Sequence, residues 1–321
     1  MKILKSDFQS SSLAKKHAGS ILAKLLRYFM LLIIGYIVFY PLLYMLSNAV
    51  KSERGLLDVT RIWIPRYFSS DAFKRAFTLM NFPKALKRTL TLQAVSALIE
   101  VFTCSVIAYG FARFKFRGKN IAMALLIVSL LIPTQMYSLP LAMNYRHLDV
   151  LGIFGFFNKL TGIDIRPNIL GTAWTFYLPS VFGVGLRSGV LIYIYVQFFK
   201  GLPKELEEAA WIDGAGLFRT FFSIAVPSSS VVYTTVTLFA LIWHWNDYYL
   251  AVMYLSDNFP LAVKIYDIDT LLNAYNIWQG SSASIAAKSA CCFIFITPML
   301  ILYLVLQRKF VQSIDRVGIT G

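Results

Sequence analysis

The sequence predicts an all-α membrane protein that crosses a lipid bilayer several times. Of its 321 residues, 57% are hydrophobic and only 15% are charged, and the mean hydropathy is +0.61. Soluble domains contain about 25% charged residues. The apolar residues also gather into blocks of about 20, the length that a helix needs to cross a bilayer. Backbone groups in lipid must be bonded within their own segment, and strand-like alternation is absent, so these blocks predict helices.

Six apolar blocks predict six transmembrane helices, at residues 28–46, 89–111, 120–141, 169–199, 224–253 and 284–306. An even number places both termini on the same side of the membrane. The tail 1–27 carries six basic residues and the loop after the second span carries four, which favours cytoplasmic termini. Loop 47–88, which this orientation places outside, carries nine basic residues, so charge alone does not decide the orientation.

The segments around the spans divide the chain into a transmembrane domain, residues 28–306, a basic N-terminal tail and a C-terminal tail, residues 307–321. Three stretches between spans are expected outside the membrane, at residues 47–88, 142–168 and 254–283. The insertion 144–167 is aromatic and contains glycine, and it predicts a short surface helix.

The fourth block, residues 169–199, is too long for one straight span, because its length corresponds to about 46 Å of helix. Pro179, Gly183 and Gly185 interrupt it, which predicts a broken or bent helix. Backbone groups freed at membrane depth are tolerated only where they face protein or a wet cavity. The segment is therefore a candidate lining of a path through the membrane, and a simple kink in a packed helix is the alternative.

Composition and motifs argue against nucleic-acid binding, metal binding and catalysis. The net charge is +15, but the basic residues are scattered through loops and tails and form no compact patch. The cysteines Cys104, Cys291 and Cys292 lie in apolar blocks without metal-ligand spacing, so we expect buried core residues and no metal site. A GxxxxGK[ST] phosphate loop is absent, so this chain is expected neither to bind a cofactor nor to hydrolyse ATP.

The segment between the fourth and fifth spans, residues 201–223, predicts a helix–turn–helix on the cytoplasmic face. Pro203 suits the first helical position, where its missing N–H costs nothing. Three carboxylates in the first turns favour the positive end of the helix dipole: Glu205, Glu207 and Glu208. Residues 213–216 contain two glycines and end the helix, and an amphipathic second helix is expected over residues 217–224.

This segment resembles the "EAA" signature of permeases in ATP-binding-cassette (ABC) importers. The resemblance rests on Glu208-Ala209-Ala210, then Gly214, then Ile224-Ala225-Val226-Pro227. It implies that the loop docks as a coupling helix on a separate ATP-hydrolysing subunit. The coupling residues implied are Glu208, Ala209, Ala210, Asp213, Gly214, Ile224 and Pro227.

Other segments resemble the carbohydrate-uptake branch of these permeases, in particular the smaller membrane subunit of the maltose transporter. They are residues 108–119 (AYGFARFKFRGK), 132–141, 245–247 (WND) and the tail from residue 307. The resemblance runs from about residue 41 onward. The insertion 144–167 and the basic N-terminal extension have no obvious counterpart in that branch.

The resemblance implies a type I importer permease in the bacterial cytoplasmic membrane, without enzymatic activity of its own. The implied partners are a second permease, two ATPase subunits that bind ATP and magnesium, and an extracytoplasmic solute-binding protein that delivers an oligosaccharide. An ion-driven secondary transporter, an ABC permease for a non-sugar solute and a subunit without a path of its own remain alternatives.

Polar and aromatic residues in or near the spans are candidates for the substrate path, since ionisable groups in a membrane are costly. The candidates are Arg187, Trp243, Trp245, Asn246 and Asp247. An interfacial aromatic belt is the alternative for the tryptophans, and snorkelling to the interface is the alternative for Arg187. Asp247 is expected to cap or pair near the end of its span, and Glu100 is expected to pair with a base.

The external loop 254–283 resembles in position the permease loop that reaches into the sugar cleft of the binding protein. The candidate contact residues are Tyr275, Asn276, Trp278 and Gln279. A folded surface loop without such a role is the alternative.

Overall fold

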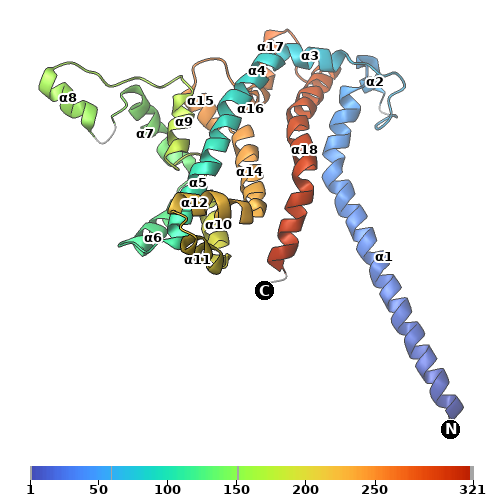
Figure 1. The fold of residues 1–321 in the computed structure, drawn as a ribbon. Coiled ribbons are helices and arrows are strands. Elements are labelled where there is room, and N and C mark those ends of the chain that lie inside the picture. The colour runs from blue at the N-terminus through green and yellow to red at the C-terminus, as the bar shows by residue number, and fades with distance from the viewer. Residues whose placement is uncertain (1, 59, 150–151, 319–321) are drawn as a thin grey trace. The chain divides into compact units, whose positions relative to one another are not determined.

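A computed structural model describes residues 2–58, 60–149 and 152–318, with side chains described at 21–52, 54–58, 60–149 and 152–307. Within these residues the regular structure is helical, apart from one antiparallel bridge between Lys51 and Phe68. Figure 1 shows the elements. In chain order they are α1 (Lys2–Ala49), α2 (Glu53–Leu57), α3 (Asp71–Leu79), α4 (Phe82–Thr89), the π-helix η1 (Leu90–Ala94), α5 (Val95–Arg113), α6 (Lys119–Ser129), α7 (Thr134–Arg146), α8 (Ile153–Thr161), α9 (Trp174–Val181), α10 (Ser188–Gly201), α11 (Glu205–Ile212), α12 (Leu217–Thr220), the π-helix η2 (Phe221–Ala225), α13 (Val226–Ser228), α14 (Ser230–Trp245), α15 (Tyr249–Tyr254), α16 (Leu261–Tyr266), α17 (Ile268–Ala274) and α18 (Ser282–Gly318).

The chain forms two compact units. The first consists of Met1–Lys74 with Gly280–Phe293, and the second of Arg75–Gln279 with Ile294–Gly321. The second unit contains the predicted coupling segment and most of the candidate site residues.

Helix α1 dominates the first unit. From Ile21 to Leu46 none of its apolar side chains is buried and most are exposed, around the whole circumference, as expected for a helix that faces lipid. The predicted first span, 28–46, lies within it, but the tail 1–27 is not separate, because the same helix begins at Lys2. Beyond α1 the chain folds back: the Lys51 ammonium donates a hydrogen bond to the Ile62 carbonyl at 2.7 Å.

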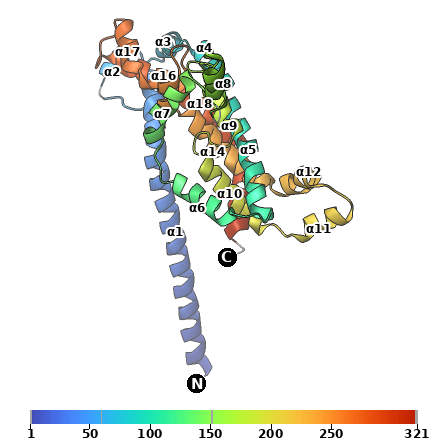
Figure 2. The same ribbon diagram turned by 90° about the vertical axis from the view of Figure 1, so that its left-hand side faces the viewer.

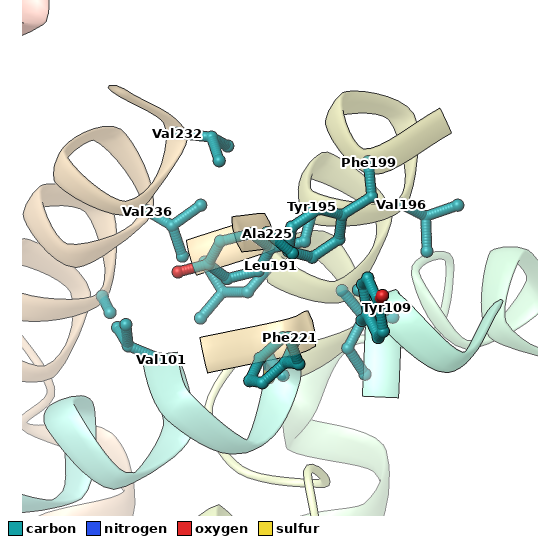
Figure 3. Packing of buried hydrophobic residues seen from close by; sticks show 14 of the residues in the cluster. Val101, Tyr109, Leu191, Tyr195, Val196, Phe199, Phe221, Ala225, Val232 and Val236 are labelled. Carbon is teal, nitrogen blue, oxygen red and sulfur yellow. The ribbon is translucent and has the colours of Figure 1, made fainter. Parts of the chain in front are cut away.

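The core of the second unit forms where α5 packs against α10 and α14. Small residues on α5, including Ala97, Cys104 and Ala108, are fully buried and let the neighbouring helices approach closely. Large side chains from α10 and η2 fill the space between the helices (Figure 3). The prediction that Cys104 is a buried core residue is confirmed, and the structure also buries Cys291 and half-buries Cys292.

Besides the fourth span, two of the predicted spans are not continuous helices. The third, 120–141, breaks into α6 and α7, which meet at 102°. The reason is Pro133, which has extended backbone angles, lacks an N–H and disfavours helical geometry at the residue before it. The fifth, 224–253, is bent by 81° at Ser229, and its helix α14 ends at Trp245 before the short α15 begins.

The fourth predicted span is broken at its glycines, as predicted, but Pro179 lies inside α9 and does not interrupt it. Helix α9 ends at Val181 and α10 begins at Ser188. In the described residues, three helices are long and apolar enough to cross a membrane, at Ile21–Ala49, Phe82–Arg113 and Ser282–Gln307, or up to five if each bent pair counts as one span. The count of six spans therefore stays a prediction.

The insertion 144–167 contains the predicted short helix, α8, which stands off from the packed helices of its unit in Figure 1. The Asp149 carboxylate accepts hydrogen bonds from the backbone N–H groups of Phe154 and Gly155, both at 3.0 Å, and so holds the start of the helix. Further along, hydrogen bonds from Arg166 hold the pKa of the exposed Asp164 carboxyl below its ordinary value.

Candidate coupling hairpin and transport cavities

The predicted helix–turn–helix is present as α11, a turn and α12. The first helix begins at Glu205, two residues after Pro203, with Lys204 at its N-cap. It ends at Ile212, and the turn that follows contains Gly214, whose φ of 79° is left-handed. The N–H of Gly214 bonds to the Trp211 carbonyl at 3.0 Å and the N–H of Ala215 to the Ala210 carbonyl at 2.9 Å, which is a Schellman ending. The second predicted helix, 217–224, is one turn of α-helix followed by the π-helix η2.

One face of this coupling hairpin, residues 205–222, is open to a partner. Figure 2 shows α11 and α12 projecting beyond the ends of α5 and α10. Of the signature residues, Glu208, Ala209, Asp213 and Gly214 are exposed, Ala210 is buried, Ile224 is half-buried and Pro227 is exposed. Apolar side chains surround them, with Ile212 87% and Phe218 80% exposed. Exposed apolar patches of this kind mark interaction surfaces.

The other face of the hairpin is fixed to the helices behind it. The Arg113 guanidinium, at the end of α5, donates to the Glu207 carboxylate at 2.8 Å and to the Leu202 carbonyl at 3.0 Å. Both side chains of the Arg113–Glu207 pair are only 4% exposed. The Tyr109 ring lies 5.0 Å from the Phe221 ring and 5.6 Å from the Phe199 ring (Figure 3). These contacts join the hairpin to α5 and α10.

The break between α9 and α10 lines a cavity of about 480 Å³, together with α6 and α7. Gly183 and Arg187 adopt left-handed backbone angles within the break, with φ of 68° and 59°. The segment therefore lines a cavity, and its role as the lining of a path through the membrane stays a prediction. Serine, threonine and tyrosine side chains supply polar groups to its wall: Ser129, Thr134, Tyr137, Tyr145 and Ser188.

A buried polar cluster supports the inner side of the break. Glu100 of α5 is fully buried, and its carboxylate accepts hydrogen bonds from the Ser188 hydroxyl and from Nε2 of His244, the latter at 2.7 Å. The second imidazole nitrogen lies 3.3 Å from the side-chain oxygen of Gln93. The expectation that Glu100 pairs with a base is therefore confirmed. The cluster ties α5, α10 and α14 together at the point where α10 begins.

Gly185 leaves the space that this carboxylate occupies, because a Cβ added there would lie 2.9 Å from Glu100 Oε2. We expect Gly185→Ala to lower the free energy of unfolding by about 1–3 kcal/mol through overpacking. Gly201→Ala is the matched control, since its added methyl group would meet nothing within 4 Å. Thermal unfolding of the purified variants in detergent measures the difference, and equal melting temperatures would contradict the packing role of Gly185.

Four of the five substrate-path candidates share a second cavity, of about 210 Å³: Arg187, Trp243, Asn246 and Asp247. Trp245 lines neither cavity. It is 3% exposed, and its indole N–H donates to the Phe295 carbonyl at 3.2 Å, so its placement gives it a packing role. The Asp247 carboxylate accepts from the Leu250 N–H at 3.1 Å and so bonds to the first turn of α15.

The four loop candidates follow α17 and are exposed: Tyr275, Asn276, Trp278 and Gln279. Asn276 has a left-handed backbone, with φ of 56°, and the Gln279 amide donates to the Asn273 side chain at 3.4 Å. These residues form a folded turn, and their contact with a binding protein stays a prediction.

Sequence reasoning missed the pairs that hold these sites. Arg113 and Glu207 both lie in motifs that were noticed, but 94 positions separate them. His244 carried no prediction, and it pairs with Glu100 across 144 positions. A buried acid predicts a basic partner, but the partner's identity follows only from the packing of the helices.

Long apolar helices, a cavity beside a broken helix and a projecting hairpin define a helical membrane permease. The chain belongs to the family of binding-protein-dependent transport system inner membrane components, which it matches over residues 102–316. This confirms the resemblance found in the sequence.

One sequence relative and two solved structures are also similar to this chain. The probable starch degradation products transport system permease protein AmyC of Thermoanaerobacterium thermosulfurigenes is 28% identical over 278 residues, which cover 85% of this chain and 89% of AmyC. A chain of a bacterial ABC transporter involved in the import of the acidic polysaccharide alginate has a TM-score of 0.68 at 17% identity, covering 90% of this chain and 96% of that one. The bacterial alginate ABC transporter in complex with alginate pentasaccharide-bound periplasmic protein gives a TM-score of 0.59 at 18% identity, covering 89% and 94%. At these identities the two structures establish the fold.

Proposed function

We propose that this chain is one of two permease subunits of an ABC importer that carries an oligosaccharide across the bacterial cytoplasmic membrane. The observation that carries the proposal is the coupling hairpin. Most of its signature residues are exposed, and the Arg113–Glu207 ion pair joins the hairpin to α5. The carbohydrate substrate is supported by the names of AmyC and of the alginate importer.

In the proposed mechanism, two separate ATPase subunits bind ATP and magnesium and close on each other. Their movement pulls the coupling hairpin, and α5 and α10 follow it through the Arg113–Glu207 pair and the contacts of Phe221. The cavities beside the α9–α10 break then open toward an external solute-binding protein, which delivers the sugar. After hydrolysis the path opens inward. The third, fourth and fifth spans would line this path.

The proposal includes a type I permease fold with six spans and both termini in the cytoplasm. The α9–α10 pair would supply the fourth span, which neither helix is long enough to make alone. In this orientation the loop that holds Tyr275 and Trp278 lies outside, where it would contact the solute-binding protein.

The test is purification of the tagged chain from its own organism in mild detergent, followed by mass spectrometry of the proteins that accompany it. We expect a second permease, an ATPase and a solute-binding protein. Recovery of the chain alone, still active in uptake without ATP, would instead identify an ion-driven secondary transporter.

A further inference from the structure

Arg187 occupies an unusual position at the junction of the two cavities, since it lines both of them. Its φ of 59° and ψ of 24° are left-handed, a conformation that is costly for residues other than glycine and asparagine. Glycine or asparagine would form this turn at a lower energetic cost than arginine does. The strained backbone instead carries an exposed guanidinium at the start of α10.

The aromatic residues beside Arg187 hold it in place. Its guanidinium lies over the Trp243 ring, with Cζ 5.0 Å from the ring centroid. The Phe239 ring stacks on the same indole, with centroids 5.6 Å apart and planes 13° from parallel. The Trp243 ring therefore positions the guanidinium. This contact accounts for the aromatic residue here, so Trp243 need not stack on a sugar ring.

Among the described residues, the Arg187 guanidinium has no carboxylate within ion-pair distance. Asp247 lines the smaller cavity as well, but its Oδ1 accepts the Leu250 N–H, and its buried Oδ2 has no hydrogen-bond partner. The cavity thus offers a cation with free donors, whereas the unsatisfied Asp247 oxygen is buried. The side-chain amides of Gln135 and Asn246 add further polar groups to the same wall.

We infer that this cavity recognises the carboxylate of an acidic saccharide, a uronate residue, through Arg187. The planar guanidinium binds a carboxylate through two parallel hydrogen bonds, and the amides of Gln135 and Asn246 are at hand for the sugar hydroxyls. A neutral sugar offers the guanidinium only hydroxyl oxygens, which are weaker acceptors than a carboxylate.

The size of the cavity limits the ligand. Its volume of about 210 Å³ is below the roughly 300–1,000 Å³ of pockets that enclose a drug-sized ligand. It therefore holds one sugar residue of a longer chain as that chain passes. This inference rests on the proposed function, since it names the class of sugar that the importer carries.

The test compares uptake of trigalacturonate, of its fully methyl-esterified form and of maltotriose by cells that carry the complete transporter. Methyl esterification removes the negative charge and leaves the sugar framework. We expect the intact transporter to prefer the free acid. In Arg187→Asn, which keeps a residue suited to left-handed backbone, the preference for acid over ester should fall roughly tenfold or more. Arg187→Lys, which keeps the charge but not the planar fork, should give a smaller fall.

The matched control is Arg166→Asn, because Arg166 is paired with Asp164 in the α8 insertion and lines neither cavity. It should leave the preference as it is. The solute-binding protein is the same in every arm, so a change in preference is attributable to the permease. Expression and ATP hydrolysis of each variant, measured in membranes, exclude a failure to fold.

An unchanged preference in Arg187→Asn, or uptake of maltotriose alone by the intact transporter, would overturn the carboxylate inference and leave the oligosaccharide importer standing. Absence of ATP-dependent uptake of all three sugars, when the partners are present, would overturn both the proposed function and this inference.

Discussion

Replacing Glu207 by alanine is expected to lower the free energy of unfolding by about 3–5 kcal/mol, because it leaves a buried guanidinium without its carboxylate. Arg113 and Glu207 are each 4% exposed and lie 2.8 Å apart. The Leu202 carbonyl would be the remaining partner of Arg113. Thermal unfolding of the purified chain in detergent, and its yield in membranes, measure the loss.

Glu208→Ala is the matched control, since it removes the same group from the next position of α11, where the side chain is exposed. A surface substitution of this kind should change the free energy of unfolding by no more than about 0.5 kcal/mol. A double-mutant cycle with Arg113→Ala separates the pair from its surroundings: removal of both residues should cost less than the sum of the single losses. If Glu207→Ala and Glu208→Ala unfold alike, the ion pair does not anchor the hairpin.

The parts of this fold that the sequence predicted depend on neighbours along the chain. Glycine ends α11 at Gly214 because the backbone there must be left-handed. Gly183 and Gly185 lie in the short break of the fourth span, and Gly183 has the left-handed backbone that glycine favours, whereas Pro179 lies inside α9. The short helix α8 follows from an aromatic insertion and a capping carboxylate, Asp149. Each of these features is decided within a few residues.

The parts that were missed depend on where distant segments meet. Hydropathy did not separate α6 from α7, because the residues around Pro133 are as apolar as a helix in lipid. Trp245 was a path candidate because it stands beside Asn246 and Asp247, but the turn that ends α14 directs it toward Phe295 instead. Arg187 and Trp243 were both candidates for the substrate path. Only the packing of α10 beside α14 shows that the Trp243 ring lies against the Arg187 guanidinium.

In this hairpin, the effect of a substitution on stability can be measured separately from its effect on coupling to the ATPase. Glu207 faces the core and fixes the hairpin to α5, whereas Glu208 faces outward. Stability should therefore depend on the first carboxylate and communication with the ATPase on the second. This division makes the proposed function testable within one turn of helix.

Reversing the charge at the second position, Glu208→Lys, is expected to reduce uptake by the complete transporter to background while the chain stays folded. A cation near the N-terminus of α11 costs only about 0.3–1 kcal/mol, so a loss of transport would come from the docking surface. Uptake of labelled sugar, together with ATP hydrolysis in the same membranes, measures it. ATP hydrolysis without uptake is the signature of uncoupling.

Gly214→Val should give a comparable loss of uptake for a different reason. The left-handed φ of 79° is unfavourable for a β-branched residue, so the turn must change and α12 must point elsewhere. Gly214→Asn is the matched control, since asparagine tolerates this conformation and no atom lies within 4 Å of the added Cβ. If Glu208→Lys and Gly214→Val both keep normal uptake, the hairpin is not the coupling element. If Gly214→Asn loses uptake as Gly214→Val does, glycine is required because the partner approaches this position closely, and not because of the left-handed φ of Gly214.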